Sequence, residues 1–279
     1  MFDIFASADA WVALLTLTFL EIVLGIDNIV FIAIVANKLP KEKQRKATNW
    51  GLLLAMVQRI VLLFAVSLLV SLREPFYTIE LSWLHTGISG QSIILFCGGL
   101  FLLYKSTSEI HEKVEFPKHE EKQIKSKRIS TLPKALLQII LIDFIFSIDS
   151  ILTAVGMTNN ISDNPKDALL LMVIAVIISI LIMMIFANAI RSFIAQHPSI
   201  QLLALSFLIL IGFMLIAEAA HLSETRIFNR EVGAIPKGYL YFAIAFSLLV
   251  EFLNMRLKRK IAIAKEKKGE AFQEEKQGR

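Results

Sequence analysis

Long apolar stretches alternate with short polar ones along the chain. A helix that crosses a bilayer needs about 20 predominantly apolar residues, and stretches of this kind recur from end to end of the sequence. The pattern predicts an all-α membrane protein with seven transmembrane helices. We expect these helices at about residues 9–36, 48–72, 91–109, 132–157, 167–192, 200–220 and 237–256.

Lysines and arginines are distributed unevenly among the polar connections. Cytoplasmic loops of membrane proteins carry an excess of these residues, and here they gather in the first connection, the third connection and the start of the tail. We therefore expect one transmembrane domain over 1–256 with its N-terminus outside and its C-terminus in the cytoplasm. The linker at 105–134 and the charged tail at 257–279 would then be cytoplasmic. The sixth connection, with Arg226 and Arg230, fits this orientation least well.

Two apolar stretches hold a pair of acidic residues near mid-length. Glu21 and Asp27 lie in the first stretch, and Asp143 and Asp149 lie in the fourth with the same spacing. An odd number of crossings per half makes the two stretches run in opposite directions through the membrane. Inverted repeats of this kind are common in secondary transporters, which bind their substrate near the bilayer midplane. We expect the repeats at about 9–109 and 132–220, followed by a seventh helix at 237–256.

The four acids indicate a buried cation site. Each acid at the centre of a transmembrane helix costs about 2.5–3.5 kcal/mol, so we expect all four to face the helix bundle and share a positive partner. Carboxylate, amide and hydroxyl oxygens suit magnesium, calcium or manganese better than zinc or copper. The candidate metal ligands are Glu21, Asp27, Asn28, Asp143, Ser147 and Asp149, with Ser150, Gly25, Gln58 and Arg59 as further candidates near the site.

The spacing of the acids sets a geometric condition on this site. Residues six apart on a regular helix point about 120° away from each other. The acids of one pair therefore meet at one ion only if the helix unwinds between them or if they line two walls of a cavity. Gly25 and Ser147 lie between the paired acids and are the candidate break points. Arg59, in the second stretch, offers a structural alternative as a partner of the acids, although one arginine cannot neutralise four carboxylates.

Composition agrees with a membrane protein and narrows the function classes. The chain of 279 residues is 56% hydrophobic with a mean hydropathy of +0.64, whereas soluble domains are about 45–50% apolar. The net charge of +5 lies in the connections without interleaved aromatic residues, so no nucleic-acid partner is expected. The single cysteine excludes a disulfide framework. With no nucleophile–base pair and no cofactor loop in the sequence, we expect no enzyme and no permanent cofactor.

The acidic segments and several others resemble a known family. They are similar to the TerC family of bacterial integral membrane proteins, in the wider LysE transporter superfamily, and to its short members that have the membrane domain alone. The resemblance implies seven spans in the bacterial inner membrane and, as for several members, export of manganese. It also implies the six metal-site residues named above. The segments that carry it are 20–29, 98–102, 143–151, 197–199 and 236–243.

The sequence therefore predicts a secondary transporter that exports a divalent cation, with Mn²⁺ as the first candidate. Its partners would be the metal ion and the lipid bilayer, and a homo-oligomer remains open. Two alternatives stay open beside it. One is a non-transporting membrane stress or scaffold protein whose acids bind a structural cation, and the other is an exporter of Ca²⁺ or of a basic amino acid.

Overall fold

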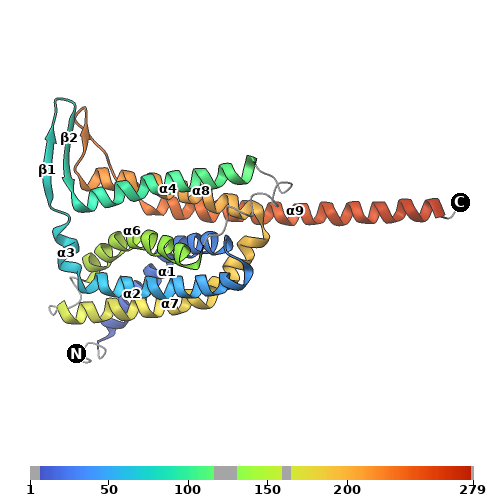
Figure 1. Ribbon diagram of the computed structural model, residues 1–279, viewed down its shortest axis with the longest axis horizontal. Coiled ribbons are helices and arrows are strands. Elements are labelled where there is room, and N and C mark those ends of the chain that lie inside the picture. Colours follow the sequence, from blue (N-terminus) through green and yellow to red (C-terminus); the bar gives the residue numbers. More distant parts are fainter. Residues whose placement is uncertain (1–6, 116–130, 159–164, 278–279) are drawn as a thin grey trace. The chain divides into compact units, whose positions relative to one another are not determined.

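The protein is described from a computed structural model that covers residues 7–115, 131–158 and 165–277. Two compact units make up the chain, Met1–Ile235 and Pro236–Arg279. Most described residues are helical (Figure 1). The helices of the first unit are α1 (Ala8–Asn37), α2 (Lys41–Phe64), α3 (Val66–Ser71), α4 (Gly90–Glu115), α6 (Leu132–Thr158), α7 (Pro165–Gln196) and α8 (Pro198–Leu222).

Six helices within the described residues are long and apolar enough to cross a membrane. They are α1, α2, α4, α7, α8 and the first part of α9, Lys237–Lys258. The sequence predicts seven such helices. The remaining predicted span corresponds to α6, a helix of 27 residues that is not among the six. Each predicted span therefore lies mainly within one long helix, although six helices among the described residues are long and apolar enough to cross a membrane.

Local sequence signals set several helix ends. Ser7 caps α1, because its side-chain oxygen accepts a hydrogen bond from the Ala10 amide at 3.3 Å. Pro40 separates α1 from α2, and Pro198 opens α8, where its missing amide proton costs nothing. The predicted stretch 48–72 is divided at Ala65 into α2 and α3.

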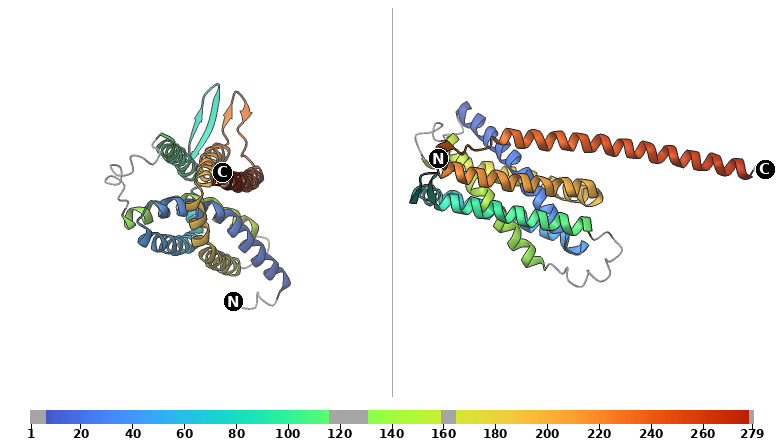
Figure 2. Two further views of the ribbon diagram at one scale, coloured as in Figure 1. Left: turned by 90° about the vertical axis from the view of Figure 1, so that its right-hand side faces the viewer. Right: turned by 90° about the horizontal axis from the view of Figure 1, so that it is seen from above.

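The helices of the first unit form two groups (Figures 1 and 2). The four-helix group consists of α1, α2, α6 and α7, in which α1 packs mainly on α7 and α2 mainly on α6. The other group is the pair α4 and α8. Glycines bring this pair close together, since a Cβ atom on Gly99 would lie 2.6 Å from the carbonyl oxygen of Gly212. Small residues allow such close approach between membrane helices.

A four-stranded antiparallel sheet joins two connections far apart in the sequence. It consists of β1 (Pro75–Glu80), β2 (Leu84–Ser89), β3 (Arg226–Ile227) and β4 (Arg230–Glu231), in that order. Leu84 of β2 pairs with Ile227 of β3, so the connection before α4 is hydrogen-bonded to the one after α8. The expectation of an all-α protein is therefore wrong for these connections, and the fold is mostly helical with one small sheet.

The second unit is the single helix α9 (Lys237–Gln277). Its first part is apolar and its later part is charged, so the predicted tail at 257–279 continues the helix as far as Gln277. The predicted linker at 105–134 begins with the last turns of α4, which ends at Glu115. Residues 116–130 of that linker lie outside the described residues.

Candidate functional site

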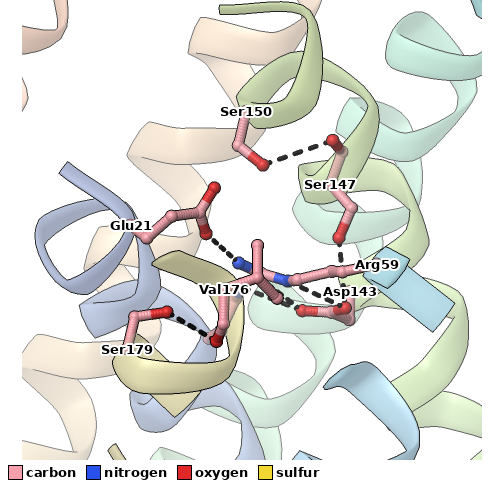
Figure 3. A network of polar contacts seen from close by, with 8 residues as sticks. Glu21, Arg59, Asp143, Ser147, Ser150, Val176 and Ser179 are labelled. Atoms are coloured by element: carbon pink, nitrogen blue, oxygen red, sulfur yellow. Dashed lines mark hydrogen bonds and ion pairs between the residues drawn. The ribbon is translucent and has the colours of Figure 1, made fainter. Parts of the chain in front are cut away.

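The interior of the four-helix group holds one buried arginine between two carboxylates (Figure 3). Arg59 of α2 donates from Nη1 to Glu21 Oε2 of α1 at 2.6 Å and from Nη2 to Asp143 Oδ1 of α6 at 2.8 Å. A longer contact joins Arg59 Nε and Asp143 Oδ2 at 3.4 Å. All three residues are 3% exposed. The first and fourth predicted spans thus supply one acid each to a shared positive charge.

Two further side chains bond to the Asp143 carboxylate. Asn28 Nδ2 donates to Oδ1 at 3.0 Å, and Ser147 Oγ donates to Oδ2 at 3.1 Å. Ser150 lies one turn further along α6 and donates to the Ser147 carbonyl oxygen at 3.2 Å. We call Glu21, Arg59, Asp143, Asn28 and Ser147 the central network. Hydrogen bonds bring these five predicted site residues together. Figure 3 shows Ser150 beside Ser147.

Asn28 also carries an unused acceptor into the central network. Its side-chain oxygen Oδ1 is buried and has no hydrogen-bond partner in the described part of the chain. A buried amide oxygen without a partner costs about 1–3 kcal/mol, and such an atom calls for an explanation. Asn28 lies seven residues after Glu21, a spacing that places both side chains on one face of α1. This oxygen is an available ligand beside two carboxylates.

The predicted helix breaks at Gly25 and Ser147 are wrong. Both α1 and α6 run through these positions as regular helices. Gly25 instead makes room for α7, because a Cβ atom there would lie 2.5 Å from Met183 Sδ. Ser147 uses its hydroxyl group to support Asp143. Glu21 and Asp143 meet because they come from different helices, whereas the geometric condition on two acids of one pair concerns Asp27 and Asp149, whose side chains lie outside the described residues.

The four-acid arrangement is only half described. The side chains of Asp27 and Asp149 lie outside the described residues, although the backbone at both positions is helical. Among the described side chains, no three histidine, cysteine, aspartate or glutamate residues lie close enough to hold a metal ion by themselves. The central network therefore offers Glu21 and Asp143 as its carboxylates, with Asn28 and Ser147 as neutral oxygen donors.

Gln58 does not reach the carboxylates but contacts the backbone beside Asp143. With its amide oriented to satisfy both groups, its oxygen accepts from the Phe144 amide at 2.8 Å and its nitrogen donates to the Ile140 carbonyl at 3.2 Å. In a regular α-helix these two backbone groups belong to one rung of hydrogen bonds. Gln58 therefore ties α2 to α6 next to Asp143 and orients the site rather than binding a ligand.

Sequence reasoning missed a second buried ion cluster. Glu109 of α4 is 6% exposed. It accepts hydrogen bonds from Lys38, which follows α1, and from Lys105 at 3.0 Å. Burial lowers the pKa of the Lys38 ammonium group, and the nearby Glu109 carboxylate only partly offsets that effect. The spacing of four residues between Lys105 and Glu109 signals a helical ion pair, but nothing local in the sequence signals its burial.

Ser179 of α7 is a further buried polar group that the sequence did not single out. It is fully buried and donates to the Val176 carbonyl at 2.9 Å within its own helix. Figure 3 draws both residues beside the central network. A hydroxyl group bonded to its own helix is already satisfied, so Ser179 has no need of a ligand.

The central network contains more acidic than basic side chains, and its acidic and neutral groups offer oxygen ligands. Glu21 and Asp143 contribute two carboxyl groups against one guanidinium group on Arg59, and the neutral donors Asn28 and Ser147 both bond to Asp143. Oxygen donors of these types bind hard divalent cations. Arginine in this position occupies the place that a cation bound by both carboxylates would take. The geometry thus fits either a permanent internal ion pair or a site where Arg59 and a cation alternate.

Comparisons with known proteins place this architecture. A profile described as "Integral membrane protein TerC family" matches residues 6–268. The chain is similar to the UPF0053 inner membrane protein YgdQ of Escherichia coli, with 44% identity over 90% of this chain and 95% of the relative. It is also similar to a UPF0053 protein of Haemophilus influenzae, with 40% identity over 93% of this chain and 99% of the relative.

A longer relative matches over less of its own length. The UPF0053 inner membrane protein YoaE of Escherichia coli is 39% identical over 89% of this chain, but the match spans 43% of that relative. No solved structure matches the chain. The profile match over nearly the whole chain, together with relatives at 40% identity or more, fixes its family. The chain belongs to the TerC family of integral membrane proteins.

Proposed function

We propose that the protein is a secondary transporter of the inner membrane that exports a divalent metal cation from the cytoplasm, with Mn²⁺ as the first candidate. The names of YgdQ and YoaE describe them as inner membrane proteins, which supports the location. Family membership supports a membrane-embedded function, and a place in the LysE superfamily is part of the proposal. We propose no enzymatic activity and no permanent cofactor.

One observation carries the proposal. Glu21 and Asp143 come from two different long helices and converge on a single buried positive charge. Buried ionisable residues in membrane helices mark ion pathways more often than they serve packing alone. Beside them, the Asn28 oxygen is buried without a partner among the described residues. A transported cation would take the place of Arg59 between the carboxylates and complete its coordination with that oxygen.

Arg59 would then act as the internal counter-ion of the empty site. When the cation leaves, two buried carboxylates without a partner would be costly, and the guanidinium group compensates them. When a cation binds, Arg59 must withdraw from at least one acid. Occupancy of the site and the position of α2, which carries Arg59, are coupled by this exchange.

We also propose the seven-span, inverted-repeat architecture. Exchanging α1 with α6, α2 with α7 and α4 with α8 converts the α1–α7 contact into the α6–α2 contact, as a two-fold relation between repeats requires. The same exchange leaves the α4–α8 pair unchanged.

The sheet supports the seventh crossing. Strands β2 and β3 are hydrogen-bonded neighbours, so they lie on one side of the membrane. The chain between them contains α4, α6, α7 and α8. Three crossings would place the strands on opposite sides, whereas a fourth crossing by α6 returns them to the same side. The orientation with both termini as predicted, N-terminus outside and C-terminus in the cytoplasm, is the one we propose.

Transport of manganese into inside-out membrane vesicles tests the function. We expect wild-type protein to accumulate Mn²⁺, and Glu21→Gln and Asp143→Asn to reduce the rate at least about tenfold, because loss of a group that merely supports a metal ligand already costs about 10–100-fold. Asp27→Asn and Asp149→Asn belong in the same series. Glu74→Gln, an exposed acid after α3, is the matched control and should transport normally. Wild-type uptake that survives both central substitutions would refute the proposal.

A second candidate function rests on Arg59 itself. Because Arg59 bonds to both carboxylates without any metal, the network also suits a membrane scaffold or stress protein with a permanent ion pair. That function predicts no Mn²⁺ flux in proteoliposomes, with stability that depends on Arg59. Since a guanidinium group already occupies the site, the same flux assay should include arginine and lysine beside Ca²⁺ as competitors.

A further inference from the structure

A small cavity lies beside Glu109, away from the central network. It lies between α1, α4, α6 and α8, and its volume of about 10 Å³ leaves room for about one water-sized group. Its polar wall consists of Glu109, Lys38, Lys105, Ser106 and Gln138, and the opposite wall is apolar. These five residues form what we call the Glu109 site. They come from both helix groups of the first unit, since α1 and α6 belong to one and α4 to the other.

The Glu109 site contains an oxygen without a partner. Ser106 is 1% exposed, lines the cavity, and its hydroxyl oxygen has no hydrogen-bond partner in the described part of the chain. Gln138, whose side chain carries an amide, also lines the cavity. With the Glu109 carboxylate, the cavity therefore has acidic, hydroxyl and amide groups on its wall, the same three ligand types that surround Asp143. Hard divalent cations select these donors.

The two lysines and the acid differ in how firmly they are held. The Glu109 side chain is 7% exposed, whereas those of Lys38 and Lys105 are 32% and 31% exposed. A lysine is a point charge on a flexible stem, so either ammonium group can move into water while Glu109 stays buried. Both lysines now donate to the same carboxylate. The central network has the same arrangement, because there the basic side chain of Arg59 donates to the carboxylates of Glu21 and Asp143.

The cavity lies on the face of α1 that leads to the central network. Phe31, Val35 and Lys38 line the cavity and follow Asn28 at helical spacing on one face of α1. Ten residues of helix separate Asn28 from Lys38, a rise of about 15 Å. The cavity reaches Phe31, one turn from the residue that bonds to Asp143.

We propose that the Glu109 site is a receiving site for the exported divalent cation on its way from the cytoplasm to the central network. This inference rests on the proposed function and orientation, which put the C-terminal end of α1 on the cytoplasmic side. A cation binds Glu109, Ser106 and Gln138 after Lys38 and Lys105 have swung toward water. An anion is a poorer occupant, because the Glu109 carboxylate stays in the cavity wall and both ammonium groups are already bonded to it.

The test is the Mn²⁺ concentration that gives half-maximal uptake into inside-out vesicles, where the cytoplasmic side faces the medium. We expect Glu109→Gln to raise this concentration at least about tenfold, because a ligand-supporting group alone is worth about 10–100-fold, with normal amounts of folded protein in the membrane. The matched control is Glu115→Gln, an exposed acid on the same helix, which should leave the concentration within about twofold of wild type.

A second variant keeps the test decisive if Glu109→Gln does not fold. Lys38→Gln removes a competitor for the Glu109 carboxylate, so the half-maximal concentration should fall. Lys41→Gln, at an exposed position three residues later, controls for the loss of one surface charge. Absence of Mn²⁺ uptake by wild-type protein refutes the proposed function and this inference together. Normal wild-type uptake with an unchanged half-maximal concentration in Glu109→Gln, or an unchanged or raised one in Lys38→Gln, refutes the receiving site alone.

Discussion

Replacing Arg59 by methionine removes the positive charge that Glu21 and Asp143 share. Arg59 makes two short charge-assisted bonds, of 2.6 and 2.8 Å, at a site that is 3% exposed. Removing one partner of a buried ion pair costs about 3–5 kcal/mol, because the remaining charge is left uncompensated. At about 2–4 °C per kcal/mol for chains of this size, we expect the melting temperature of Arg59→Met in detergent to fall by roughly 10 °C without metal.

Manganese should then restore much of the lost stability. Without Arg59, the two carboxylates and the Asn28 oxygen are free to bind a cation. A ligand at 100 times its dissociation constant stabilises the folded state by about 2.7 kcal/mol, which is more than half of the expected loss. Wild-type protein should gain less from the same Mn²⁺ concentration, because the cation must first displace Arg59. The assay is thermal unfolding of purified protein across a Mn²⁺ titration, with and without chelator.

A matched arginine separates this effect from general damage. Arg191 is partly buried and donates to two neutral oxygens, Gln44 Oε1 at 2.6 Å and Asn37 Oδ1 at 3.3 Å. Arg191→Met should cost about 1–3 kcal/mol and should gain no more from Mn²⁺ than wild type does. Two results would contradict a cation site between Glu21 and Asp143. Arg59→Met could be as stable as wild type without metal, or Mn²⁺ could raise the melting temperatures of Arg59→Met, Arg191→Met and wild type equally.

Three further predictions follow from packing, pairing and coordination. Gly99→Ala should lower the free energy of unfolding by about 1–3 kcal/mol, because its Cβ atom would lie 2.6 Å from the Gly212 carbonyl oxygen. The control Gly233→Ala, with open space around it, should change the free energy of unfolding by about 0.5 kcal/mol at most. Equal melting temperatures of the two variants would contradict the α4–α8 contact. The double variant Leu84→Cys with Ile227→Cys, in a Cys97→Ser background, should form a disulfide in intact cells. Paired strands hold opposite Cα atoms at about 4.5–5.5 Å, and the outer side of the inner membrane is oxidising. A non-reducing gel without this cross-link would argue against an external sheet. Asn28→Ala should reduce the rate of Mn²⁺ transport at least about tenfold. The control Asn188→Ala, which removes only the 2.9 Å bond to Asn49, should transport within about twofold of wild type. A smaller loss of transport in Asn28→Ala than in Asn188→Ala would show that the Asn28 amide is not a ligand.

Much of the helical part of the fold could be predicted because lipid imposes a simple rule on the sequence. Backbone groups in a bilayer must be paired within the segment, so apolar stretches of sufficient length become helices. Each predicted span lies mainly within one long helix. The cost of a buried charge predicted that the acids face the interior. Glu21 and Asp143 do so, and Arg59, weighed from the sequence as their structural partner, is the residue that joins them.

What could not be predicted depends on contacts between distant residues. The sheet pairs Leu84 with Ile227, and β3 has only two residues, too few for a pattern of alternation. Glu109 is buried and accepts a hydrogen bond from Lys38, 71 residues earlier. In the sequence, Glu109 stands among charged residues at the edge of a linker. Gly25 resembles a break point in the sequence, but the nearby Met183 of α7 explains it as a packing position.

The grouping of helices has a mechanical consequence. In the proposed inverted-repeat arrangement, each repeat contributes its first two long helices to the four-helix group and its last to the α4–α8 pair. Contacts within the groups far outnumber those between them. Because each group contains helices of both repeats, a rocking motion of one repeat against the other would break the helix contacts within both groups. If the four-helix group, which holds the central network, instead slid as a rigid body along the α4–α8 pair, the contacts within both groups would be kept. The Glu109–Lys38 ion pair joins the two groups, so it would have to break before one group could slide along the other.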